Sequence, residues 1–131
     1  MIDGVDHIGV ATADVDALAL RLAALFDCGS GPRTEHGGIA IRFVQVGAVR
    51  LELLEPLDHP SLERFLARDG PGLHHLALAC ADLDATVGTL TALGVEPLAD
   101  TPDRGVEGHR ICFLPPAAVG GTLIELVETD G

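Results

Sequence analysis

The chain contains an internal repeat, and this repeat limits the folds that its 131 residues can adopt. The segment Asp6–Ala17 recurs as His74–Ala85, and the register then continues without a gap, so that Leu22 corresponds to Leu90. Two copies are too few to stack as a solenoid. We therefore expect a duplicated pair of modules that pack together, with a concave cleft of the kind that binds small ligands.

The pattern of apolar residues predicts the same order of elements in both halves. In the first half it predicts strands over Val5–Ala11, 39–46 and Val49–Leu54, a helix over Val15–Phe26 and a weak strand within 29–38. In the second half it predicts strands over Leu73–Ala79, Val95–Ala99, Arg110–Leu114 and Thr122–Val127, and a helix over Leu83–Leu93. A short helix over Ser61–Ala67, with Ser61 as its N-cap, is expected between the halves.

These elements predict an α+β fold of two tandem βαβββ modules that form one curved mixed sheet around a metal cleft. The length fits a single domain, residues 1–131. Within it we expect module 1 over residues 1–57, a linker helix over 58–70 and module 2 over 71–131.

The charge of the chain excludes several classes of partner. The formal net charge is −12, all eight cationic side chains are arginines, and Trp and Tyr are absent. Such a composition argues against nucleic acid and anionic membrane surfaces as partners. The three cysteines do not have the spacing of zinc ligands. No targeting segment is recognised in the sequence, and we therefore expect a cytoplasmic protein.

Each half supplies one histidine near its start and one glutamate near its end. His7 and His75 occupy equivalent positions of the repeat, and Glu52 and Glu125 lie in the similar segments Val49–Leu53 and Thr122–Leu126. Imidazole and carboxylate ligands suit divalent Mn, Fe, Co, Ni or Zn. The sequence therefore predicts a mononuclear metal site made of His7, Glu52, His75 and Glu125. His74 is expected to be structural or to support a ligand. His36, His59 and His109 lie in polar loops and are not expected to be ligands, although His36 and His109 could rim the cleft.

The chain resembles the vicinal oxygen chelate superfamily and, within it, the methylmalonyl-CoA epimerases. The resemblance is carried by Asp6–Ala11, Leu51–Leu57, Gly72–Ala77, Gly105–Leu114 and Gly121–Val127. It implies the same four metal ligands, with Co or Mn preferred, and by analogy a homodimer.

The resemblance also implies an isomerase that epimerises 2-substituted malonyl-CoA thioesters by proton abstraction and return through a metal-chelated enediolate. Glu125 is the expected catalytic residue, as a ligand that also carries a proton. Some of these epimerases have a glutamate where this chain has Ile41, so the second base is unassigned. If the small-molecule substrate is an acyl-CoA, at least two of Arg42, Arg50, Arg104 and Arg110 have to bind its phosphates, since the chain has no lysine.

Two other functions fit the same ligands. One is an isomerase or lyase of the same superfamily with a CoA-free substrate, such as a glyoxalase I or a natural-product epimerase. The other is a non-catalytic relative that binds a small molecule.

Overall fold

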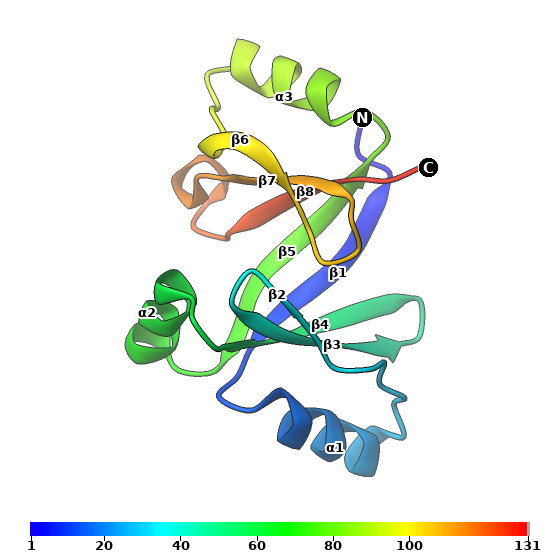
Figure 1. Cartoon of the computed structure of the whole chain (residues 1–131). Coiled ribbons are helices and arrows are strands. Elements are labelled where there is room, and N and C mark those ends of the chain that lie inside the picture. Colours follow the sequence, from blue (N-terminus) through cyan, green and yellow to red (C-terminus); the bar gives the residue numbers. More distant parts are fainter. Residues whose placement is uncertain (131) are drawn as a thin grey trace. The chain divides into compact units, whose positions relative to one another are not determined.

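A computed structural model describes residues 1–130 and, for residues 99–103, the backbone alone. The elements follow one another as β1 (Gly4–Ala11), α1 (Val15–Phe26), β2 (Thr34–His36), β3 (Ile39–Val46), β4 (Val49–Pro56), α2 (Pro60–Asp69), β5 (Gly72–Cys80), α3 (Leu83–Ala92), β6 (Leu98–Arg104), β7 (Arg110–Leu114), the short 3₁₀ helix η1 (Pro116–Val119) and β8 (Ile124–Glu128). This order is βαβββ twice, with α2 between the copies (Figure 1). The predicted fold class is confirmed.

The chain divides into two compact units, residues 7–74 and residues 1–6 together with the chain from residue 75 onward. In the first unit the strands lie in the order β2-β3-β4-β1. Strands β3 and β4 form an antiparallel hairpin, whereas β1 runs parallel to β4. The hairpin turns at Gly47 and Ala48, where Gly47 has a φ of +59° that glycine adopts without strain.

Helix α1 covers one face of the first unit's sheet. Its Val15 and Ala19 pack against Ala40, Val44 and Leu53, which lie on β3 and β4. Strand residues two apart share a face, so the residues between these core positions point to the opposite face of the sheet.

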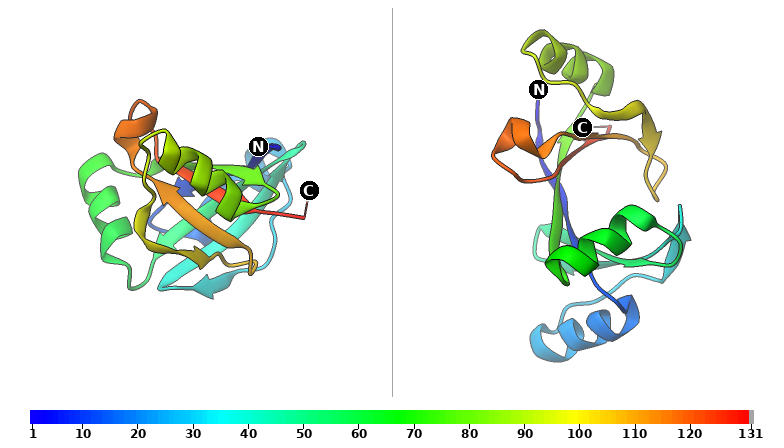
Figure 2. Two further views of the ribbon diagram at one scale, coloured as in Figure 1. Left: turned by 90° about the horizontal axis from the view of Figure 1, so that it is seen from above. Right: turned by 90° about the vertical axis from the view of Figure 1, so that its left-hand side faces the viewer.

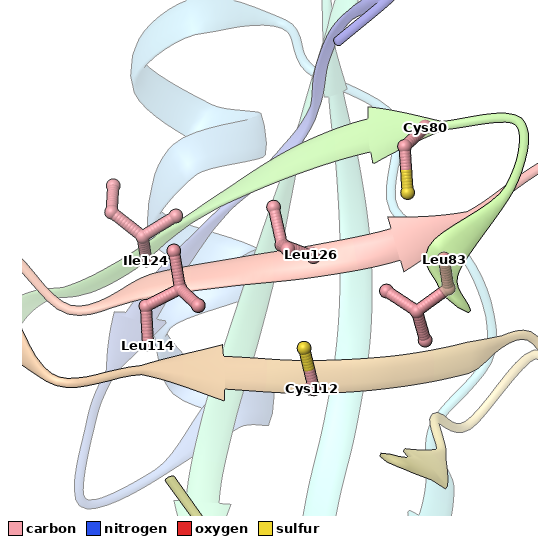
Figure 3. Packing of buried hydrophobic residues seen from close by; sticks show 6 residues of the cluster. All are labelled: Cys80, Leu83, Cys112, Leu114, Ile124 and Leu126. Carbon is pink, nitrogen blue, oxygen red and sulfur yellow. The ribbon is translucent and has the colours of Figure 1, made fainter. Parts of the chain in front are cut away.

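The second unit repeats this arrangement with the strand order β5-β8-β7-β6. Strand β5 runs parallel to β8, and β7 runs antiparallel to it. Figure 2 shows α3 beside this sheet, where it contacts β8. Figure 3 labels six buried side chains that pack together between α3 and the sheet: Cys80, Leu83, Cys112, Leu114, Ile124 and Leu126.

Helices α1 and α3 begin in the same way. The Asp14 carboxylate accepts a hydrogen bond from the Ala17 N–H at 3.0 Å, and Asp82 accepts one from Ala85 at the same distance. These side chains satisfy N–H groups that a helix leaves without an internal partner. The repeat therefore preserves the helix caps as well as the core.

A glutamate at the end of each parallel strand also reaches the first turn of a helix. The Val15 N–H donates to Glu55 Oε1 at 3.0 Å, and the Leu83 N–H donates to Glu128 Oε2 at 2.9 Å. A carboxylate is stabilised at a helix N-terminus because the peptide dipoles point their positive ends there. These bonds fix the end of β4 to α1 and the end of β8 to α3.

The predicted boundaries of α2, β6 and β8 are wrong, and for the starts of α2 and β6 a local hydrogen bond gives the reason. Helix α2 is capped by His59 instead of Ser61, because Pro60 suits the first helical position and His59 Nδ1 accepts from the Leu62 N–H at 3.1 Å. Strand β6 begins at Leu98 instead of Val95, because the Val95 N–H donates back to the Leu90 carbonyl at 2.9 Å and closes the end of α3. Strand β8 begins at Ile124, two residues later than predicted.

The three cysteines should differ in their reaction with thiol reagents. Burial raises the pKa of the Cys112 thiol to about 11 and also raises that of Cys80, whereas Cys28 is half-buried. Since the thiolate is the reactive form, the native protein at pH 8 should react rapidly with one equivalent of Ellman's reagent, at Cys28. The fast phase should be absent from Cys28→Ser, and three equal fast reactions in the native protein would contradict this packing.

Candidate metal centre

The first unit brings His7 and Glu52 together. His7 lies on β1 and Glu52 on β4, and the parallel register pairs Glu52 with Gly9, two residues after the histidine. His7 Nε2 lies 3.5 Å from Glu52 Oε1, and the two residues are only 5% and 8% exposed. A histidine and a carboxylate are thus held side by side in a nearly dry environment.

The second unit brings His75 and Glu125 together with the same register. Glu125 of β8 pairs with Ala77 of β5, again two residues after the histidine. His75 Nε2 lies 3.7 Å from Glu125 Oε1, and the two residues are 6% and 5% exposed. The four residues that the sequence singled out therefore form two buried pairs of closely similar geometry, one in each unit.

A phenylalanine orients each of these pairs. Phe43 pairs with Glu52 across the β3–β4 hairpin, and its ring stands edge-on to His7 with centroids 6.1 Å apart. Phe113 pairs with Glu125 and stands edge-on to His75 at 5.8 Å. Edge-to-face packing at this distance is favourable and restricts the rotation of the imidazole. Neither ring was predicted to lie beside the His–Glu pairs, although counting back from the Gly47-Ala48 turn places Phe43 opposite Glu52.

The chemistry of the two pairs fits a divalent metal ion. A buried carboxylate loses hydration, and a protein usually compensates for this loss with a cation or with hydrogen bonds. Two imidazole nitrogens and two carboxylate oxygens are ligands that Mn, Fe, Co, Ni and Zn accept, and none of the four is a thiolate. We conclude that the donor set is compatible with a divalent metal.

The remaining histidines have other contacts. His74 lies on β5 next to His75, so its side chain points to the opposite face of the strand, and its ring stands edge-on to Phe65 of α2 with centroids 4.7 Å apart. His59 caps α2, as described above, and the carbonyl of His109 accepts from the Gly105 N–H at 2.9 Å. The rings of His59 and His74 thus make contacts with α2, whereas the bond of His109 involves its backbone alone.

The arginines considered for phosphate binding differ in their surroundings. Arg42 Nε donates to Asp16 at 2.6 Å and Arg110 Nη2 to Asp84 at 2.6 Å, and these bonds lower the pKa of both aspartates. Both guanidinium groups lie on the helix side of their sheets. On that side they stabilise the starts of α1 and α3.

Arg104 and Arg50 make different contacts. Arg104 Nη1 donates to the Gly108 carbonyl at 2.7 Å. Arg50 lies with its guanidinium carbon 4.4 Å from the centroid of the Phe43 ring, a cation–π contact. Arg50 thus contacts the Phe43 ring, which stands edge-on to His7.

Two parallel strand pairs, each with a buried histidine and glutamate, define a duplicated fold with a candidate metal centre. The chain belongs to the glyoxalase/bleomycin resistance protein/dioxygenase superfamily, whose family model matches residues 6–113. This is the superfamily that the sequence resemblance named.

Among its relatives are methylmalonyl-CoA epimerases. The mitochondrial enzyme of Dictyostelium discoideum is 32% identical over 97% of this chain and 79% of its own length. The crystal structure of the Mycobacterium tuberculosis enzyme is 33% identical, with a TM-score of 0.90 over 97% of this chain and 88% of that chain. A variant of the Streptomyces coelicolor enzyme in complex with 2-nitronate-propionyl-CoA is also 33% identical, with a TM-score of 0.91 over the whole of both chains.

Removing the charge of Glu125 should leave the metal-free protein as stable as before or make it more stable. A buried carboxylate has a desolvation cost that a neutral amide of the same shape does not have. Urea unfolding in the presence of EDTA should therefore give Glu125→Gln a free energy of unfolding within about 1 kcal/mol of wild type, or higher. A loss well above 1 kcal/mol would show that the carboxylate is needed for folding itself. Leu126→Ala, next to it in the core, should cost about 2–5 kcal/mol and shows that the assay responds.

Proposed function

We propose that this chain is a metal-dependent epimerase of 2-substituted malonyl-CoA thioesters, with His7, Glu52, His75 and Glu125 as ligands of one divalent ion. The observation that carries the proposal is the duplicated His–Glu pair, buried and in the same register in both units. The likeness to methylmalonyl-CoA epimerases, which extends over nearly the whole chain, supports the choice of substrate. Co or Mn is the ion that the family resemblance favours.

A bound divalent ion supplies Lewis acidity, which draws charge from a substrate's oxygens and acidifies the proton on the carbon between them. The chain's own residues do the remaining work. Glu125 takes that proton on a carboxylate oxygen and is held in place by the edge-on packing of Phe113 against His75. The apolar neighbours on the same face keep water away, which strengthens every electrostatic interaction there.

Inversion at the carbon requires a second group that gives a proton to the opposite face. Ile41, where some epimerases have a glutamate, pairs with Leu54 and is buried, and its side chain has no exchangeable proton. The second proton carrier is therefore another group, or a water that such a group orients.

One observation favours a second candidate, an isomerase or lyase whose substrate carries no CoA. Three of the four arginines considered for phosphate binding donate hydrogen bonds within their own unit, namely Arg42, Arg104 and Arg110. Truncated thioesters that lack the nucleotide distinguish the two functions. A CoA-dependent enzyme should have a much higher KM for them, and an enzyme for CoA-free substrates should not.

None of the helices in residues 1–130 has the length and apolar character of a membrane span. The homodimer and the cytoplasmic location stay predictions.

The protein loaded with Co²⁺ or Mn²⁺ should incorporate deuterium from D₂O into methylmalonyl-CoA and interconvert its two epimers. Dialysis against EDTA should abolish this exchange, and the metal should restore it. Glu125→Gln should lower the rate roughly 10²–10⁴-fold, the range of a single general base, and should weaken metal binding. Mass spectrometry measures the exchange, and isothermal titration measures the metal affinity.

The matched control for this experiment is His59→Asn. Asparagine is a good N-cap, so the change keeps the start of α2 while it removes an imidazole outside the pairs. Its exchange rate should equal that of wild type. Absence of deuterium incorporation in the metal-loaded wild-type protein would overturn the proposed function.

A further inference from the structure

The two glutamates differ in the residue that lies two positions before them in the chain. Arg50 lies two residues before Glu52 on β4, and the corresponding position before Glu125 is Leu123. The duplicated framework thus carries a cation beside the glutamate in the first unit and an apolar side chain in the second.

Strand register places Arg50 on the same face as the metal-ligand candidates. Residues two apart on a strand share a face and lie about 6.6 Å apart along it, so Arg50 and Glu52 are neighbours. Arg50 also pairs with His7 in the parallel register of β1 and β4. Leu51 and Leu53, between and beyond them, face the helix instead and pack in the core beneath α1.

The guanidinium group is held in a defined place on that face. Its carbon lies 4.4 Å from the centre of the Phe43 ring, and Phe43 in turn stands edge-on to His7. A planar group stacked on an aromatic ring loses little conformational freedom on binding a ligand. The same planar guanidinium can donate two parallel hydrogen bonds to a carboxylate.

We propose that Arg50 recognises the free carboxylate of the substrate and so selects 2-substituted malonyl thioesters over simple acyl thioesters. This inference rests on the proposed function. A malonyl thioester differs from an acetyl or propionyl thioester by a carboxylate on the reacting carbon. In the proposed function this carbon and its carboxylate lie next to Glu52. The phosphates of CoA are separated from that carbon by the whole pantetheine arm. A residue next to Glu52, such as Arg50, is therefore too far from the phosphates to bind them.

The test compares ligands with and without the carboxylate. Isothermal titration of metal-loaded wild type and Arg50→Gln with malonyl-CoA and acetyl-CoA gives four dissociation constants. Loss of a charge-assisted bidentate contact should weaken malonyl-CoA binding roughly 10- to 100-fold and change acetyl-CoA binding less than about 2-fold. Arg21→Gln, an exposed arginine on α1, is the matched control and should change neither constant.

A second arm distinguishes the carboxylate from the phosphates as the bound anion. With methylmalonyl-pantetheine, which lacks the nucleotide, Arg50→Gln should raise KM by the same factor as with methylmalonyl-CoA. A penalty that disappears for the truncated substrate would mean that Arg50 binds phosphate, and it would overturn the inference. Equal weakening of malonyl-CoA and acetyl-CoA would overturn it as well.

Metal affinity separates recognition from a role in building the site. Removal of a neighbouring cation should leave the metal dissociation constant of Arg50→Gln unchanged or make it smaller. Arg50→Lys keeps the charge but lacks the planar guanidinium, and it should show an intermediate loss of malonyl-CoA binding. Loss of metal binding in both variants would make Arg50 a structural residue and contradict the proposal.

If wild type exchanges the proton and the variants bind both thioesters as wild type does, the inference alone fails. If wild type does not exchange it, the proposed function fails first.

Discussion

The parallel pairing of β1 with β4, and of β5 with β8, is the constraint on which the rest of this structure depends. In each pairing the glutamate lies opposite the residue two positions after the histidine, so both side chains leave the same face of the sheet next to each other. Parallel strands need a long connection between them. Each connection here contains a helix and a hairpin, and the helix covers the face that the histidine and glutamate do not use.

The two faces of each sheet therefore have different tasks. The helix side holds the apolar core, and it also holds the Asp16–Arg42 and Asp84–Arg110 ion pairs and the two glutamates that meet helix N-termini. The other face buries histidine and glutamate, which cost free energy there unless a cation compensates for their desolvation. Glu55 and Glu128 each follow a ligand candidate by three residues. They fix the end of its strand to a helix, and this rigid attachment suits a site whose ligands must hold their positions.

Much of this arrangement could be predicted from the sequence because the repeat aligns chemically identical residues. A single histidine on an apolar strand says little, but His7 and His75 in equivalent positions, each followed by a glutamate, restrict the interpretation strongly. The contribution of Phe43 and Phe113 depends on hairpin register, which the apolar pattern alone does not specify. The cap of α2 and the start of β6 depend on single hydrogen bonds, from Leu62 to His59 Nδ1 and from Val95 to the Leu90 carbonyl, which leave no periodic signal.

The arginines show why the role of a charged residue is hard to predict without a structure. In sequence Arg42 and Arg50 look equivalent, both within the β3–β4 hairpin of a strongly acidic chain. Alternation along the strands separates them: Arg42 pairs with Leu53 and faces α1, whereas Arg50 shares a face with Glu52. A cation on the helix side adds stability through Asp16, and a cation on the other side is placed to meet an anionic ligand. The two arginines thus lie on opposite faces because Arg42 is paired with Leu53, one residue from Glu52 on β4, whereas Arg50 lies two residues from Glu52 on the same strand.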